Sequence, residues 1–150
     1  MNAHQKIEMI PFARNPTSKP VGAAARAELL KDPGFGRVFT DHMVTIRWTK
    51  DHGWHDAQVR AREPISLDPA AAVLHYGQEI FEGLKAYNLS DGSIALFRAD
   101  QNARRFRESA VRMALPELPE AIFPQLVRAD VVGHDEAHAS DPAYFHVALQ

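Results

Sequence analysis

The sequence contains no cysteine among its 150 residues. This absence excludes disulfide bonds, thiolate metal sites and cysteine nucleophiles, and it suits the reducing cytoplasm, where we expect the protein to be located. No apolar run approaches the roughly 20 residues that span a bilayer, and the first 20 residues lack the basic start and apolar core of a signal peptide. We therefore expect no association with a membrane.

The common motifs of nucleotide and ester chemistry are also missing. No glycine-rich phosphate loop and no Gly-x-Ser-x-Gly elbow occurs in the sequence. A formal net charge of −2 gives no electrostatic attraction to nucleic acid. His134 and His138 have the i, i+4 spacing of two zinc ligands on one helix face, but no third ligand is indicated. We therefore predict no metal site and interpret this segment as a solvated polar tail.

The residues that are present describe an ordinary globular domain. Hydrophobic residues make up 45% of the chain and charged residues 24%, and the length allows one hydrophobic core. Turn residues separate short segments of alternating or helical period, which predicts a mixed α and β domain with antiparallel hairpins. The expected elements are an edge strand at 7–12, a helix at 23–31, a hairpin formed by 38–48 and 54–62, a short helix from Asp68, a second hairpin formed by 84–89 and 93–98, and a helix from Asp100 to about Met113.

Three helix predictions are specific enough to be checked. Asp100 is expected to cap a helix whose buried face carries Ala103, Phe106, Ala110 and Met113 and whose other face carries solvated arginines. Asp68-Pro69 is expected to start a second helix, which Gly77 and Gly83 keep short. Pro124 is expected to break a third helix over 122–130, because proline removes a backbone donor.

The segment LHYGQEIFEGLKAY, residues 74–87, places glycines, aromatic rings and ionisable groups between a helix and a hairpin. One interpretation is structural, with the rings in the core and the glycines serving the backbone. The other is a pocket wall, where apolar rings surround a small substrate. The residues alone leave both interpretations open.

This segment, together with DGSIALFRADQNARRFRESAVRMALPELP and the upstream GFGRVFTDHMVTIRW, closely resembles class IV aminotransferases, specifically the branched-chain amino-acid aminotransferases. The resemblance covers about residues 33–119. It implies the N-terminal α/β domain of fold type IV, with pyridoxal 5'-phosphate bound between that domain and a larger one. The expected organisation is a strand, linker and short helix at 1–32, the family domain at 33–120, and a divergent tail at 121–150.

The resemblance also implies roles for particular residues. The Asn-x-x-Arg pattern at 102–105 assigns the cofactor phosphate to Arg105, whose guanidinium presents a planar fork of donors to an anion. The substrate-binding aromatics of the family match Phe35, Tyr76 and Phe81. The family's cofactor lysine has no counterpart in this chain, so we assign no catalytic residue here and interpret Lys85 as structural.

The implied activity is transamination of leucine, isoleucine or valine with 2-oxoglutarate by a homodimeric enzyme, of which this chain is an N-terminal part that is inactive alone. The alternative is a non-catalytic interaction or dimerisation domain derived from that family. From Val131 onward the sequence resembles nothing in the family. Our hypothesis is that the reading frame shifts near Val131, and the alternative is a short paralogue with a new tail.

Overall fold

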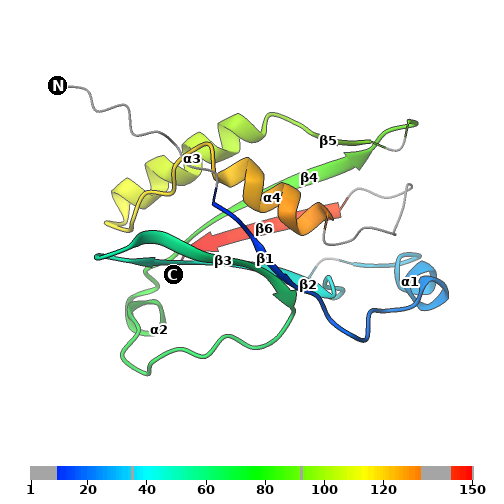
Figure 1. The fold of residues 1–150 in the computed structure, drawn as a ribbon, viewed down its shortest axis with the longest axis horizontal. Helices are drawn as coiled ribbons and strands as arrows, with labels where there is room; N and C mark the ends of the chain where they lie inside the picture. Colours follow the sequence, from blue (N-terminus) through cyan, green and yellow to red (C-terminus); the bar gives the residue numbers. More distant parts are fainter. Residues whose placement is uncertain (1–9, 35, 92, 133–142, 150) are drawn as a thin grey trace.

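The structure, a computed structural model, describes residues 10–34, 36–91, 93–132 and 143–149. Two three-stranded sheets lie beside a pair of helices, α3 (Ala99–Arg112) and α4 (Phe123–Val132), as Figure 1 shows. Helix α3 packs against one sheet, α4 contacts the other, and the two helices contact each other. The mixed α and β class predicted from the sequence is confirmed.

The first sheet has the order β1-β3-β2, with β1 (Ala13–Asn15) parallel to β3 (Gly53–Ala61) and β2 (His42–Thr49) antiparallel to it. The predicted hairpin is confirmed, and Gly53 takes the positive φ of 63° that its turn requires. Of the strand expected at 7–12, residues 10–12 form no strand, and β1 follows Pro11 at Ala13–Asn15, since proline donates no ladder hydrogen bond. Residues 7–9 lie outside the described residues.

The second sheet has the order β5-β4-β6, and both pairings of its central strand are antiparallel. Strands β4 (Ile80–Asn88) and β5 (Ile94–Leu96) form the predicted second hairpin. Strand β6 (Ala143–Leu149) pairs with β4 from Ile80 to Ala86, so part of the divergent tail completes this sheet. The segment with His134 and His138 lies outside the described residues.

Alternation along β4 decides which side chains meet the helices. Ile80, Leu84 and Ala86 are buried and belong to the main core, whereas Phe81 is 75% exposed on the other face of the strand. Helix α3 covers the buried face with Ala103, Phe106 and Ala110, as its spacing predicts. The core therefore lies between β4 and the two helices.

Two predicted helix starts are wrong by a few residues. Helix α3 begins at Ala99 with Arg98 as the residue before it, and Asp100 lies in its first turn. Helix α2 (Ala72–Tyr76) begins after Asp68, whose carboxylate accepts a hydrogen bond from the Ala70 amide at 2.7 Å and so closes a turn instead. Gly77 ends α2 in the left-handed conformation, whereas Gly83 lies within β4 and interrupts no helix.

The prediction that Pro124 breaks the last helix is wrong. Helix α4 runs from Phe123 to Val132 with Pro124 as its second residue. An amide in the first turn has no acceptor within its own helix, so proline removes nothing there. Helix α1 (Ala23–Leu29) is close to its predicted range. None of the helices in the described part of the chain combines the length and apolar character needed to cross a bilayer.

Candidate functional site

A nearly buried carboxylate, that of Glu82, lies at the centre of the candidate site. Glu82 shares the face of β4 that also carries Leu84 and Ala86, and its side chain is 11% exposed. A charged group withdrawn from water to this extent needs hydrogen-bond donors or an opposite charge. Helix α3, which packs on β4, supplies both.

Arg105 of α3 binds Glu82 through two parallel hydrogen bonds. Its Nε donates to Oε1 at 2.8 Å, and its Nη2 donates to Oε2 at 3.0 Å. This is the bidentate pairing in which a guanidinium and a carboxylate fit best. The hydrogen bond to Glu82 and its negative charge raise the pKa of Arg105 above its ordinary value. The arginine side chain remains 58% exposed, so the pair lies at the edge of the core.

Asn102, one turn before Arg105 on α3, completes the arrangement. Its Nδ2 donates to Glu82 Oε2 at 2.7 Å and to the carbonyl of Gly83 at 3.2 Å. Asn102 is only 7% exposed. We call these three residues, Glu82, Asn102 and Arg105, the Glu82 cluster.

The other arginines of α3 have partners of a different kind. Arg104 donates to Glu108 of its own helix at 2.9 Å, and both side chains are more than half exposed. Arg107 pairs with Glu120 at 3.3 Å, again with both groups partly exposed. Their surroundings agree with the solvated face that the sequence predicts, and they distinguish Arg105 from its neighbours.

The Glu82 cluster fits a phosphate at one point. A guanidinium has five N–H donors, and Glu82 takes two of them along the edge formed by Nε and Nη2. The other edge, formed by Nη1 and Nη2, has no partner among the described residues. An exposed, permanently charged fork of this kind suits a dianionic phosphate.

The predicted aromatic residues are not gathered around this cluster. Tyr76, at the end of α2, is 84% exposed, and its ring contacts that of His75 edge to face at 6.4 Å. Phe81 lies on the face of β4 opposite Glu82. Phe35 lies outside the described residues. Among the described residues, Tyr76 and Phe81 form no enclosed pocket.

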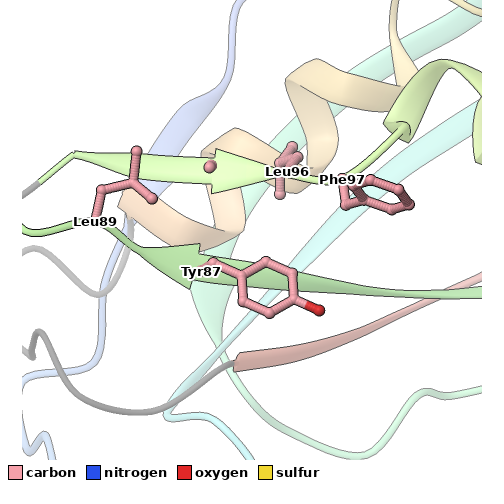
Figure 2. A pocket seen from close by; sticks show the side chains of 5 residues that line it. Tyr87, Leu89, Leu96 and Phe97 are labelled. Carbon is pink, nitrogen blue, oxygen red and sulfur yellow. The ribbon is translucent and has the colours of Figure 1, made fainter.

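An apolar depression lies further along the same hairpin, as Figure 2 shows. It has a volume of about 600 Å³ and is lined by Tyr87, Leu89, Ala95, Leu96 and Phe97. Tyr87 follows Glu82 by five residues, which corresponds to roughly 17 Å along a strand. The depression is therefore distinct from the Glu82 cluster, and the sequence reasoning did not identify it.

The sequence reasoning also did not assign roles to Glu82 and Asn102. The signal was the alternation of β4, which places an acidic residue on the same face as Leu84 and Ala86 and so requires a cationic or amide partner. Which helix residue supplies that partner depends on packing between segments 20 residues apart. Among the described side chains, no group of His, Asp and Glu could hold a metal ion.

No protein-family model matches the chain. Curated relatives do match it strongly. A "Probable branched-chain-amino-acid aminotransferase" of Streptomyces coelicolor is 50% identical over 134 residues, which is 87% of this chain and 37% of the relative. Proteins named "Branched-chain-amino-acid aminotransferase" from Mycolicibacterium smegmatis and Mycobacterium tuberculosis are 54% and 56% identical over 79% and 73% of this chain. The chain spans about a third of the length of these relatives.

Proposed function

Because the chain belongs to the branched-chain-amino-acid aminotransferase family, we propose that it forms the part of such an enzyme that anchors the phosphate of pyridoxal 5'-phosphate and supplies one wall of the substrate pocket. The observation that carries this proposal is the 50–56% identity to the named aminotransferases. Arg105, with its available donor edge, is the structural feature that supports the phosphate role.

The proposed reaction transfers an amino group between leucine, isoleucine or valine and 2-oxoglutarate. Pyridoxal phosphate, when bound, supplies the electron sink for this transfer. Arg105 would hold the phosphate and so fix the cofactor's position. Phe35, Tyr76 and Phe81 are proposed to surround the branched aliphatic side chain, which is recognised by apolar burial.

The chain does not supply the lysine that transfers a proton during transamination. Among the described residues, Lys85 is the lysine within the segment that resembles the family's pocket, and it lies in the middle of β4, paired in register with Tyr144 of β6. We keep Lys85 as a structural residue. The lysine that serves the family's cofactor belongs to a part of the enzyme that this chain does not contain. The chain alone is therefore proposed to be inactive.

A chimeric enzyme tests the proposal directly. Residues 33–119 would replace the matching segment of the Mycolicibacterium smegmatis relative, which is 54% identical over 119 residues. The chimera should transaminate leucine, isoleucine and valine with 2-oxoglutarate, because the exchanged segment would contribute the phosphate anchor and the aromatic wall. A chimera that folds and dimerises like its parent but shows no transamination would contradict the proposal.

The alternative is a non-catalytic interaction or dimerisation domain, and the exposed rings Tyr76, Phe81 and Phe97 favour it. Apolar side chains that form a contiguous exposed patch commonly mark a contact with another protein surface. An active chimera argues against this alternative. An inactive chimera, combined with stable self-association of the 150-residue chain in sedimentation experiments, would support it.

Two further proposals concern the complete enzyme. We propose that it is a homodimer, which sedimentation of the chimera would show. We also propose that it works in the cytoplasm on small amino acids and 2-oxo acids, without nucleic acid or membrane partners, which cell fractionation would test.

A further inference from the structure

We propose that Glu82 is a positioning residue for phosphate binding: it holds Arg105 by one edge of the guanidinium so that the other edge is presented to the phosphate, and Asn102 holds Glu82 in place. This inference rests on the proposed function, in which Arg105 is the phosphate anchor. It concerns two residues to which the resemblance assigned no role.

The first step is the division of the guanidinium into two edges. Glu82 takes Nε at 2.8 Å and Nη2 at 3.0 Å, which is the side edge of the fork. The end edge, with one proton of Nη1 and the second proton of Nη2, can still form a bidentate pair with two phosphate oxygens. One planar group can therefore bind a protein carboxylate and a ligand phosphate at the same time.

The second step is that Glu82 is itself fixed. It lies in the central strand of its sheet, and its side chain is 11% exposed. Asn102 bridges its Oε2 and the backbone carbonyl of Gly83, which ties the carboxylate to the strand. Because both the strand and the helix hold this carboxylate, it restrains Arg105. Glu108, the partner of Arg104, lies on the surface of the same helix and is 55% exposed, so it restrains Arg104 less.

The third step concerns the balance of effects on affinity. The negative charge of Glu82 weakens the attraction of phosphate for Arg105, but solvent screens this repulsion because the arginine is 58% exposed. A long, flexible arginine loses rotamer freedom when it binds a ligand, and the bidentate pair with Glu82 has already removed much of that freedom. We therefore expect the restraint to outweigh the repulsion.

The test follows the Nε–H signal of Arg105 by nuclear magnetic resonance in the chimeric enzyme without bound cofactor, with inorganic phosphate as the probe. In the natural sequence this signal should be protected from exchange with water and should shift with phosphate until saturation. Glu82→Ala should remove the protection and weaken phosphate binding by at least about threefold. Glu82→Gln, which keeps one acceptor oxygen and the shape of the side chain, should retain part of both.

Two variants complete the design. Asn102→Ala should leave the chemical shift of the Arg105 signal unchanged but reduce its protection from exchange. The substitution removes a hydrogen bond to the Glu82 carboxylate and none to the Arg105 guanidinium. Glu108→Gln is the matched control, since it removes the charge of the partner of Arg104 and should change neither the Arg105 signal nor phosphate binding. If Glu82→Ala unfolds the chain, the comparison of Glu82→Gln with Glu108→Gln carries the test.

The outcomes separate the inference from the function on which it rests. Phosphate binding that is unchanged or tighter in both Glu82 variants would overturn the positioning role and leave Arg105 as the anchor. A protected Arg105 signal that phosphate does not shift in any variant would overturn the anchor itself, and the positioning role with it. A phosphate shift that weakens in the order natural sequence, Glu82→Gln, Glu82→Ala would support both.

Discussion

Arg104 and Arg105 are adjacent in sequence and differ in what holds them. The partner of Arg105 comes from a strand 23 residues earlier and is nearly buried, whereas the partner of Arg104 is Glu108, four residues later on the same exposed helix surface. Exposed pairs within one helix contribute little to stability and restrain their side chains weakly. The two residues therefore form a natural pair of test and control.

In the chimeric enzyme, we expect Arg105→Ala to weaken binding of pyridoxal phosphate by about tenfold or more, because it removes a bidentate charge-assisted contact. Arg104→Ala should change the affinity by less than about twofold. Equilibrium binding followed by cofactor absorbance would measure both. Equal losses in the two variants would mean that Arg105 is not the phosphate anchor.

Asp91 lies in the turn of the β4–β5 hairpin and is held by Ser93. Its Oδ1 accepts hydrogen bonds from the Ser93 hydroxyl at 2.6 Å and the Ser93 amide at 2.9 Å, and these bonds lower the pKa of Asp91 below its ordinary value of 3.8. Because the pKa of Asp91 is lower in the folded state, its ionised carboxylate stabilises the turn at pH values above the ordinary pKa. This stabilisation is lost as the pH falls through the lowered pKa of the folded state. Ser93→Ala should raise the pKa toward 3.8, as a carbon-detected titration of the carboxyl group would show.

At the scale of elements, α4 connects the last part of the chain to the core. Phe123 begins the helix, and its ring lies 5.5 Å from that of Phe106 on α3, with both side chains buried. Leu126 and Val127 follow on the same buried side. Packing of α4 therefore depends on these apolar contacts and not on the residue at position 124.

This leads to opposite expectations for two neighbouring substitutions. Phe123→Ala should lower the free energy of unfolding by about 3–5 kcal/mol, since it leaves a cavity beside Phe106. Pro124→Ala should change it by less than about 1 kcal/mol, because the amide it restores has no acceptor in the first turn. Chemical denaturation of the two variants would compare them. A large loss for Pro124→Ala would show that the proline itself stabilises the helix start.

The elements that the sequence predicts correctly are those whose folding signals lie within one short segment. The two hairpins and the buried face of α3 are encoded locally, by turn residues and by the spacing of Ala103, Phe106 and Ala110. The effect of Pro124 is not predictable from local sequence, because it depends on whether the helix starts before or after this residue. The pairing of Glu82 with Arg105 was beyond local patterns, since it needs β4 and α3 to pack together. Phe35 and the tail around His134 stay predictions, because they lie outside the described residues.

At the scale of the whole molecule, a considerable apolar surface faces solvent. Tyr76, Phe81 and Phe97 are 84%, 75% and 72% exposed, and the depression lined by Tyr87 and Leu96 adds to them. Soluble monomers rarely expose large contiguous apolar patches. A domain's net stability is only about 5–15 kcal/mol, so a domain that depends on another surface to cover such rings would lose a considerable part of its stability when isolated.

We expect the isolated 150-residue chain to be marginally stable and prone to aggregate. A dye that fluoresces on apolar surfaces should bind before thermal unfolding begins, and the transition should be broad. The chimeric enzyme serves as the comparison and should bind less dye for each molecule. A sharp transition of the isolated chain with little prior dye binding would show a self-sufficient domain and would favour the non-catalytic alternative.

The isolated chain should also show no transamination of leucine with 2-oxoglutarate, because we propose that the lysine serving the cofactor lies outside it. The assay requires protein free of host aminotransferase, and the chimeric enzyme is the positive control. Turnover that follows the purified chain through successive columns would show that a residue of this chain, with Lys85 as the first candidate, moves the proton.

The sequence contains two tryptophans, and both belong to the first hairpin, where Trp48 on β2 lies opposite Trp54 on β3. The indole of Trp54 donates to the carbonyl of Glu117 at 2.9 Å, across 63 residues of sequence. Indole fluorescence of this protein will therefore follow the docking of one hairpin onto the segment after α3. It will give little direct information on the β4–β5 hairpin, for which Tyr87 is the intrinsic fluorophore. A folding experiment that excites only tryptophan would therefore report mainly on the first sheet.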